Sequence, residues 1–273
     1  MLPLSKYPTD QIEKENVENT FSSALMTDIY RKALTLAGLD KHLIIVGEIG
    51  SGKKRLGRFI HEHSDRKNAP FYCFYCIDIE ESDYKEVFWE QIEVQVSHIV
   101  ISYKALENAS GGFLFLDQFS ELKESFMLDM IESYQQGCHQ LFKFSPSLSP
   151  RLLISINRES YRNLLTKPLW NHLQNLLQPL MIMVPPLRER REDIPDLIKD
   201  FLKKIRNTRE QWFDLTISDQ AIDACINYNW PGNIHQLKNA LLQGAVLSNG
   251  KQIEVQHLPF SLNWRLPYRL GKD

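Results

Sequence analysis

A glycine-rich segment that ends in lysine contains the residues whose types and spacing most directly indicate chemistry. It fits the pattern G-x-x-x-x-G-K, in which backbone N–H groups and a lysine surround phosphate oxygens. The residues that we expect to bind a nucleotide here are Gly47, Glu48, Ile49, Gly50, Ser51, Gly52, Lys53 and Lys54. Glycines let the backbone curl around an anion, and the lysine adds a full positive charge. We call residues 47–54 the phosphate loop.

The segments on either side of the phosphate loop are those that such a loop requires. Residues 42–46 form a short apolar run typical of a buried strand, and apolar residues recur at helical spacing over 56–60. The positive end of that helix adds to the field at the anion. Lys54 departs from the generic pattern, which has Ser or Thr there to ligate magnesium. We therefore expect any metal to depend on a second, acidic motif and on water.

Two further apolar runs end in polar residues that could face the same anion. The run at 113–116 follows two glycines and precedes Asp117. Carboxyl ends of parallel strands share one edge of a sheet, so Asp117 is expected to face the phosphate loop and hold magnesium through water. The run at 151–156 precedes Asn157. This asparagine either lies beside the γ-phosphate or merely caps the next turn.

Composition restricts the classes of protein to which the chain can belong. Its 273 residues carry a formal net charge of −2, so no overall basic field attracts nucleic acid. No apolar run approaches the length needed to span a bilayer, and the first residues lack a signal core, so we expect a cytoplasmic protein. Cys73 and Cys76 form a lone C-x-x-C in an aromatic, apolar segment, which favours a buried strand over a metal or redox site.

The order of the elements predicts an α/β domain followed by a small helical domain. We expect a parallel sheet flanked by helices over residues 15–187 and a helical domain without strands over 188–262. Residues 1–14 are assigned to a lead-in and 263–273 to a tail. Expected elements are helices at 20–37, 80–94, 121–136, 168–177, 194–205, 218–228 and 233–246, and strands at 71–77 and 180–184. The pattern over 95–109 does not distinguish strand from helix, and Ser218 and Asn233 are expected to cap the helices that follow them.

Five segments give the sequence a family resemblance. They are GEIGSGKKRLGRFIHEHSDR, GGFLFLDQFSEL, RLLISINRE, PPLRERREDI and NWPGNIHQLKNAL. In these segments and their order the chain resembles the central AAA+ domain of bacterial sigma-54-dependent transcriptional activators (enhancer-binding proteins). The resemblance implies an AAA+ P-loop NTPase fold with a helical lid, and ATP and magnesium as cofactors. Members of this family use ATP hydrolysis in a ring, usually a hexamer, to remodel RNA polymerase that carries sigma-54.

The sequence departs from this family at positions that support ATP hydrolysis. The family's acidic pair Asp-Glu is Asp117-Gln118 here, so an amide replaces the general base that activates water. Asn157 falls on the family's sensor asparagine. Two arginines that reach the γ-phosphate of the neighbouring subunit are replaced by Trp170 and Leu176. The resemblance therefore implies nucleotide binding with weakened hydrolysis.

Three further departures concern nucleotide sensing, the output loop and DNA. His235 replaces the arginine of the family's N-[VI]-R-E-L motif and is either a weak nucleotide sensor or a surface helix residue. The family's GAFTGA loop, which touches sigma-54, has no counterpart between residues 78 and 111. The chain also stops after the lid, before the helix-turn-helix domain of the activators, so direct sequence-specific DNA binding is not expected.

These features predict an ATP-binding AAA+ protein of bacterial transcription regulation that is impaired in hydrolysis and works through protein contacts. Expected partners are AAA+ subunits of its own or a related kind, in a ring, with RNA polymerase or sigma-54 as further candidates and no membrane partner. The alternative is an active AAA+ ATPase that regulates transcription without the sigma-54 loop, which the intact Lys53, Asp117 and Asn157 favour. A third hypothesis is a P-loop phosphotransferase, but the NWPGN segment and the lack of an acceptor-binding motif argue against it.

Overall fold

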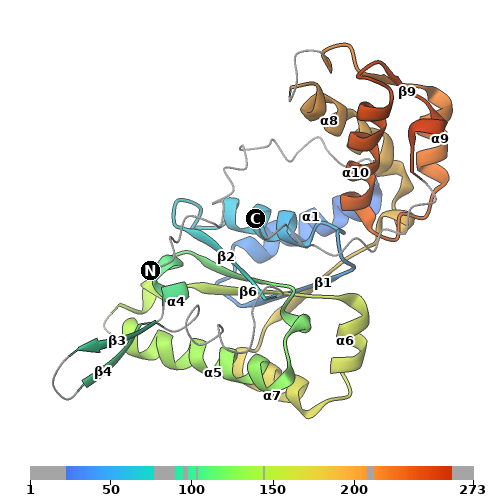
Figure 1. Ribbon diagram of the computed structural model, residues 1–273. Helices are drawn as coiled ribbons and strands as arrows, with labels where there is room; N and C mark the ends of the chain where they lie inside the picture. Colours follow the sequence, from blue (N-terminus) through green and yellow to red (C-terminus); the bar gives the residue numbers. More distant parts are fainter. Residues whose placement is uncertain are drawn as a thin grey trace.

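A five-stranded parallel sheet forms the centre of the molecule (Figure 1). The computed structural model describes residues 23–76, 90–94, 98–102, 104–143, 145–207 and 212–259. The strands are β1 (Leu43–Gly47), β2 (Phe71–Tyr75), β5 (Phe113–Asp117), β6 (Arg151–Ile156) and β7 (Leu180–Val184), in the spatial order β2-β5-β6-β1-β7. The predicted α/β class with a parallel sheet is confirmed.

Helices cover both faces of the sheet, and this is why the central strands are apolar along nearly their whole length. The helices α1 (Ala24–Ala37) and α2 (Lys53–Glu62) cover the face to which Leu43 and Ile45 point. Ile44 and Val46 point to the other face. That face is covered by α4 (Lys104–Asn108), α5 (Glu124–Leu141), α6 (Arg158–Leu164) and α7 (Pro168–Leu177).

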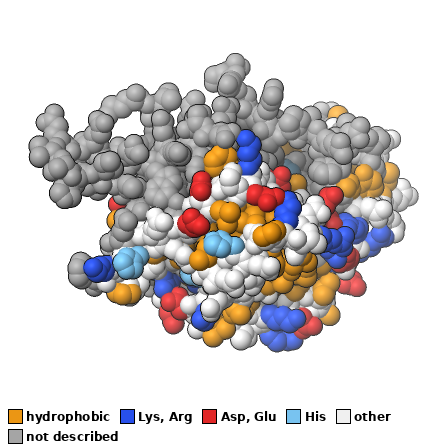
Figure 2. All heavy atoms as spheres, turned by 90° about the horizontal axis from the view of Figure 1, so that it is seen from below, with side chains coloured by type: hydrophobic (Ala, Val, Ile, Leu, Met, Phe, Trp, Pro, Cys, Tyr) orange, Lys and Arg blue, Asp and Glu red, His pale blue; other side chains and the backbone are white. Residues whose placement is uncertain are grey.

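The face formed by α5 and α7 carries no single type of side chain. Figure 2 views the molecule from this side and shows hydrophobic, acidic and basic side chains interspersed among the residues that it colours. Such a mixture is ordinary for a protein surface. Among the described residues this view therefore gives no indication of a nucleic-acid-binding field.

A second, smaller core lies beyond β7 and belongs to the lid. The helices α8 (Ile194–Arg206), α9 (Asp219–Asn227) and α10 (Asn233–Leu247) pack around the buried Trp230, whose indole N–H donates to the Cys225 carbonyl oxygen (2.7 Å). The expectation that this region lacks strands is wrong. β8 (Thr216–Ile217) and β9 (Gln252–Ile253) form a parallel pair, which is too short for a periodic pattern to reveal.

The prediction of a helix over residues 80–94 is wrong for the part of this segment that the structure describes. Glu90–Val94 is β3, which is antiparallel to β4 (His98–Ser102), and Figure 1 shows this hairpin apart from the five-stranded sheet. Polar and apolar residues alternate from Gln91 to Val94 with the period of two that is typical of a strand. The undecided segment 95–109 contains β4 and then α4. Residues 77–89, within the stretch where a GAFTGA loop would lie, are outside the described residues.

Two of the predicted helix starts are capped by serine hydroxyls. The helix expected from residue 20 begins at Ala24, and the Ser23 hydroxyl accepts the Met26 N–H (3.3 Å). Ser218 caps α9 as predicted, by accepting the Ala221 N–H (3.3 Å). The lead-in of 1–14 and the tail of 263–273 lie outside the described residues. In the part of the chain that is described, no helix has the length and apolarity needed to cross a membrane.

Candidate nucleotide-binding site

The phosphate loop turns between β1 and α2 because glycine occupies positions that need a left-handed backbone. Gly50 has a φ of +73° and Gly52 a φ of +104°, values that other residues rarely adopt. A Cβ atom at Gly50 would also lie 2.4 Å from the carbonyl oxygen of Gly232 in the lid. Position 50 thus requires glycine both for its backbone angle and for the close approach of the lid.

Three consecutive carbonyl oxygens of the loop accept hydrogen bonds from the lid side. The Ile49 oxygen accepts from Nδ2 of Asn233 (2.9 Å), and the Gly50 oxygen accepts from the N–H of Ile234 (3.1 Å). The next carbonyl, that of Ser51, accepts from a terminal nitrogen of Arg190 (2.6 Å). In a trans peptide the following N–H points opposite to the carbonyl, so these bonds turn loop N–H groups away from the lid.

Asn233 does not have the capping role that its sequence context predicts. The N-cap of α10 is Gly232, and Asn233 is the first helical residue, with a φ of 54°. Its side chain is instead used for long-range bonds, because Oδ1 accepts the buried N–H of Leu187 (2.8 Å) while Nδ2 contacts the loop. The residue therefore ties the phosphate loop, the end of the sheet domain and α10 together.

Lys53 provides the cationic group of the loop. It is the first residue of α2 and is buried, and its Nζ donates to the carbonyl oxygens of Gly47 (2.9 Å) and Glu48 (3.0 Å). Burial lowers the pKa of Lys53, and the Asp117 carboxylate counteracts part of this effect. Backbone donors and a neighbouring ammonium group are the chemistry that phosphate recognition requires.

Glu48 pairs with the lid. Both of its carboxylate oxygens bind the guanidinium of Arg188, at 2.6 and 2.8 Å, and Oε2 also accepts from Asn233 (3.3 Å). The hydrogen bond from Arg188 is the main reason that the pKa of Glu48 is lowered. A two-pronged carboxylate–guanidinium pair fixes orientation as well as distance. Arg188 came from a charge-dense segment that gave no sequence signal for this contact.

A buried charged network lies directly behind the loop. The Arg190 side chain is 1% exposed, and one terminal nitrogen lies 3.8 Å from Oδ2 of Asp193, which is fully buried. Asp193 accepts from the N–H (2.7 Å) and the hydroxyl (3.0 Å) of Ser23, at the start of α1. Desolvation lowers the pKa of Arg190, and the Asp193 carboxylate opposes that shift. The loop, the lid and α1 thereby share one set of buried polar contacts.

The carboxyl edge of the sheet brings Asp117 to the same region. Its Oδ1 accepts from the Ser155 hydroxyl (2.7 Å) and from the N–H of Gln118 (3.0 Å). Ser155 lies inside the buried strand β6, where a single serine among apolar residues gives no recognisable pattern. Gln118 has a φ of 55° and begins the 3-10 turn Phe119–Glu121, and its N–H also lies 2.9 Å from the Ser155 oxygen. These bonds fix the orientation of the carboxylate.

Position 54 offers a magnesium ion no hydroxyl ligand, so a metal at this edge would depend on Asp117 and water, and that role of Asp117 stays a prediction. Lys54 lies where a hydroxyl ligand is expected, and its Nζ donates to the hydroxyl of Tyr75. An ammonium group has no lone pair to offer a metal and repels it. Among the described residues, no group of three or more His, Cys, Asp or Glu side chains is arranged to hold a metal ion. Asp117 alone retains the expected ligand chemistry.

Asn157 shows one of its two expected roles. It caps α6, because its Oδ1 accepts the N–H of Glu159 (3.3 Å), while its own N–H donates to the Ser120 hydroxyl (3.2 Å). A role beside the γ-phosphate stays a prediction. The bond to Ser120 places Asn157 near the turn that follows Asp117. Asn157 and Asp117 therefore both lie at the carboxyl edge of the sheet.

The positions that the resemblance assigns to arginines are occupied by packing residues. Trp170 is 8% exposed, and its ring meets that of Tyr161 edge-on with centroids 5.2 Å apart. Leu176 is partly buried against the same core, and its carbonyl oxygen accepts from Gln135 (2.9 Å). Both side chains therefore contribute to the interior beneath the sheet and carry no charge to a neighbouring subunit.

His235 lies on α10 beside the phosphate loop. A Cβ atom built on Gly50 would lie 3.1 Å from the Cβ of this histidine. Partial burial and the nearby Lys238 lower the pKa of His235, so its imidazole is neutral at pH 7. His235 is exposed on α10, as the surface alternative expects, and the sensor role stays a prediction.

The cysteine pair belongs to the sheet. Cys73 lies in β2, and burial raises the pKa of its thiol to about 12. Cys76 follows that strand and is buried, and its N–H donates to the Asp117 carbonyl oxygen (2.9 Å). Cys73 therefore lies in the expected strand, and Cys76 lies just beyond its end.

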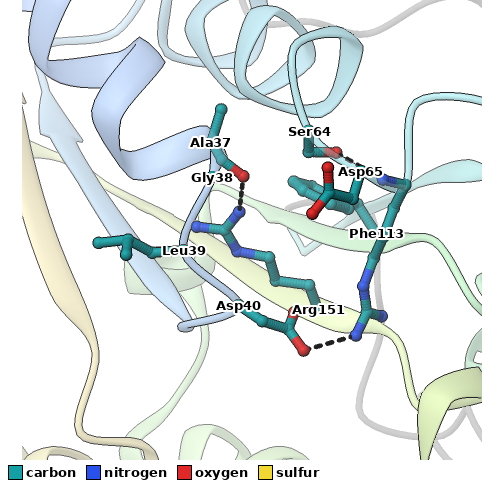
Figure 3. A pocket seen from close by; sticks show the side chains of 9 residues that line it. Ala37, Gly38, Leu39, Asp40, Ser64, Asp65, Phe113 and Arg151 are labelled. Carbon is teal, nitrogen blue, oxygen red and sulfur yellow. Dashed lines mark hydrogen bonds and ion pairs between the residues drawn. The ribbon is translucent and has the colours of Figure 1, made fainter.

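A separate hollow of about 160 Å³ lies at the opposite, amino-terminal edge of the sheet (Figure 3). Its arginines are already engaged with the protein. Arg151 donates to the carbonyl oxygens of Leu36 (2.8 Å) and Lys41 (2.6 Å), and Arg66 pairs with Asp40 (2.8 Å). These contacts tie strand starts to the α1–β1 connection, so the hollow is structural and lies away from the phosphate loop.

Comparison with known proteins identifies two adjacent family matches. Residues 20–142 match the profile of a family described as Sigma-54 interaction domain, and residues 188–267 match one described as AAA+ ATPase lid domain. Regulatory protein LuxO of Vibrio parahaemolyticus is 29% identical over 245 residues, which are 89% of this chain and 54% of that protein. The Nif-specific regulatory protein of Klebsiella pneumoniae is 31% identical over 218 residues, which are 79% of this chain and 41% of that protein. The chain thus spans about half the length of these relatives.

Solved structures share the fold. NtrX from Brucella abortus in complex with ADP superposes with a TM-score of 0.74 at 22% identity, over 90% of this chain and 56% of that one. The same protein in complex with ATP gives a TM-score of 0.72 at 23% identity, over 90% of this chain and 57% of that one. The arrangement of sheet and lid in the present chain is therefore that of an AAA+ P-loop NTPase.

Proposed function

Since the chain belongs to the AAA+ family of sigma-54-dependent transcriptional activators, we propose that it binds ATP or ADP at the phosphate loop and regulates transcription through protein contacts with little or no hydrolysis. One contrast within the site carries the proposal. Lys53 and the loop glycines have the geometry of a phosphate cradle. Gln118 and Trp170 stand where the family uses a general base and an arginine.

Several observations support nucleotide binding. The lid fixes three loop carbonyls, so the loop backbone is held in one conformation before any ligand arrives. A preorganised cradle binds an anion without a further ordering cost. The Brucella NtrX structures, which share this fold, contain ADP and ATP.

The expected loss of hydrolysis follows from what the two replaced groups supply. General-base assistance is worth on the order of 10²–10⁴-fold in rate, and an arginine that stabilises transition-state charge about 10³–10⁵-fold. A glutamine can hydrogen-bond water but cannot take its proton, and a buried tryptophan cannot reach a phosphate. Both losses act on the transition state, so ground-state affinity is expected to survive.

We propose AAA+ subunits of its own or a related kind as partners, arranged in a ring, with sigma-54 or RNA polymerase contacted by the assembly. In such a ring this chain would be a subunit that binds nucleotide but does not hydrolyse it. The active ATPase stays the second candidate, because Lys53, Asp117 and Asn157 are retained.

The proposal is tested by measuring nucleotide binding and hydrolysis on one preparation. We expect the wild-type chain to bind ADP and ATP with phosphate release near background, and Lys53→Ala to weaken binding by about 10-fold or more because a charged contact is lost. Lys32→Ala, at an exposed lysine of α1, is the matched control and should bind as the wild type does. Gln118→Glu should raise turnover by on the order of 10²-fold at unchanged affinity.

Two outcomes would contradict this function. Turnover at an ordinary enzymatic rate, about 1 s⁻¹ or faster, would favour the active ATPase instead. Failure of the wild-type chain to bind either nucleotide would remove the proposal altogether.

A further inference from the structure

We infer that Arg158 recognises the third phosphate of ATP and is the residue by which this site distinguishes ATP from ADP. The inference rests on the proposed nucleotide binding and names a determinant of its ligand preference. It starts from two ion pairs that one short turn at the start of the lid makes across the carboxyl edge of the sheet.

The 3-10 turn Leu187–Glu189 carries two adjacent charged residues that contact different parts of the site. Arg188 binds the carboxylate of Glu48 in the phosphate loop, at 2.6 and 2.8 Å. Glu189 accepts a hydrogen bond from a terminal nitrogen of Arg158 (3.0 Å), the first residue of α6. Neighbouring residues of one turn thereby join the phosphate loop to the start of α6, which brings Arg158 close to the loop.

Arg158 also follows the strand end at which a terminal phosphate is expected. β6 ends at Ile156, and Arg158 comes directly after Asn157, the residue expected beside the γ-phosphate. Its charge acts on the phosphate loop. The hydrogen bond from Arg188 is the main reason that the pKa of Glu48 is lowered, and the charge of Arg158 adds to this effect. A guanidinium so placed lies within electrostatic reach of a phosphate bound by the loop.

The present partner of Arg158 can be exchanged for a phosphate. The pair with Glu189 joins one nitrogen to one oxygen, and the two side chains are 35% and 46% exposed. Exposed pairs of this kind contribute little to stability, because water competes for both groups. A phosphate offers a guanidinium two oxygens at once and carries more negative charge than a carboxylate. The pair of Arg188 and Glu48 is already two-pronged, so we expect it to persist while Arg158 changes partner.

The charges around Lys53 explain why a third phosphate would benefit from a further cation. Burial lowers the pKa of Lys53, and three carboxylates oppose this shift, those of Asp117, Glu121 and Glu48. Carboxylates close enough to act on the lysine also repel additional phosphate charge. Arg188 neutralises one of them, and Arg158 would offset part of the remaining repulsion. This contact is made to bound ATP and not only in the transition state, so it is compatible with slow hydrolysis.

The test is calorimetric titration of the full chain with ADP and with AMP-PNP, a triphosphate analogue that resists hydrolysis, at one magnesium concentration. Arg158→Gln should weaken AMP-PNP binding by about 10-fold or more and ADP binding by less than about 3-fold, because the charged contact is made only to the third phosphate. Glu189→Gln removes the competing carboxylate and should strengthen AMP-PNP binding by about 2- to 5-fold at unchanged ADP affinity. Arg162→Gln makes the same charge change at an exposed arginine of α6 and should leave both affinities unchanged.

The opposite effects of the two variants separate recognition of the phosphate from a purely structural role of the ion pair. A pair that only holds the lid in place would make Arg158→Gln and Glu189→Gln change both affinities in the same direction, and this result would overturn the inference. An Arg158→Gln variant with the wild-type ratio of AMP-PNP to ADP affinity would overturn it as well and leave nucleotide binding intact. If Arg158→Gln does not fold, as judged by its thermal melting, the AMP-PNP affinity of Glu189→Gln decides. Binding of neither nucleotide by the wild type would refute the proposed function, and this inference with it.

Discussion

Replacing Asn233 by alanine should weaken the attachment of the lid to the phosphate loop. The Asn233 side chain is fully buried, donates to the Ile49 carbonyl (2.9 Å) and accepts the Leu187 N–H (2.8 Å). It also lies 3.3 Å from the carboxylate of Glu48. Alanine removes these bonds together and leaves a buried N–H and a partly buried carbonyl without partners.

The expected loss can be built from these contacts. An unsatisfied buried N–H costs about 1–3 kcal/mol, and the lost bond to the partly buried Ile49 carbonyl about 1 kcal/mol. The φ of 54° at this position suits asparagine, whereas alanine there costs roughly 1 kcal/mol more. The sum is about 3–5 kcal/mol, a large part of the 5–15 kcal/mol by which domains are typically stable.

Urea unfolding followed by tryptophan fluorescence measures this loss. Asn233→Gly removes the same bonds but relieves the backbone strain, so it should be more stable than Asn233→Ala by roughly 1 kcal/mol. Asn229→Ala removes only an exposed bond to Arg191 (3.1 Å) and should change the free energy of unfolding by less than about 0.5 kcal/mol. A loss below about 1 kcal/mol for Asn233→Ala would refute the idea that this side chain holds the lid.

Three further results are expected. Burial lowers the pKa of His42 to about 4, and its Nδ1 accepts the Leu152 N–H (3.2 Å). Below pH 6.5 the unfolded chain therefore binds more protons than the folded one, and the free energy of unfolding should fall by up to about 3 kcal/mol as the pH drops from about 6.5 to 4. Urea unfolding at several pH values measures this dependence, and His42→Gln should make it weaker. Gly50→Ala should lower the melting temperature and weaken ADP binding, because its Cβ would lie 2.4 Å from a lid carbonyl; normal melting would contradict the close approach. A double-mutant cycle on Glu48 and Arg188 should give a coupling of about 1 kcal/mol that decreases with salt, since the pair is partly exposed; a salt-independent coupling would argue against an ion pair.

Burial on both faces made the central strands predictable from the sequence. The apolar runs that became β1, β5 and β6 are bounded by glycine or by polar residues, and such runs have few other places in a fold. The segment of β3 is hard to recognise as a strand because its alternation is short and follows a charged stretch. The pair of β8 and β9 has two residues in each strand, which is below what periodicity can detect.

The contacts around the phosphate loop show why the rest of the site was not predictable. Arg188 and Arg190 come from a segment dense in charge, and such a segment is usually a solvated surface. Their targets are a loop carboxylate and a backbone carbonyl 139 residues or more away in the chain. No local pattern encodes which carbonyl a distant guanidinium will meet. Asn233 was read as a helix cap because capping is the commoner local use of asparagine.

The bonds between lid and loop run largely through main-chain atoms of the loop, and this has an evolutionary consequence. Carbonyl oxygens at positions 49, 50 and 51 are present whatever side chains the loop carries there. Mutational drift at positions such as 118 can therefore proceed while the architecture persists. A lineage that gives up turnover can in this way keep a folded, ligand-ready shape for selection to act on through its contacts with other proteins.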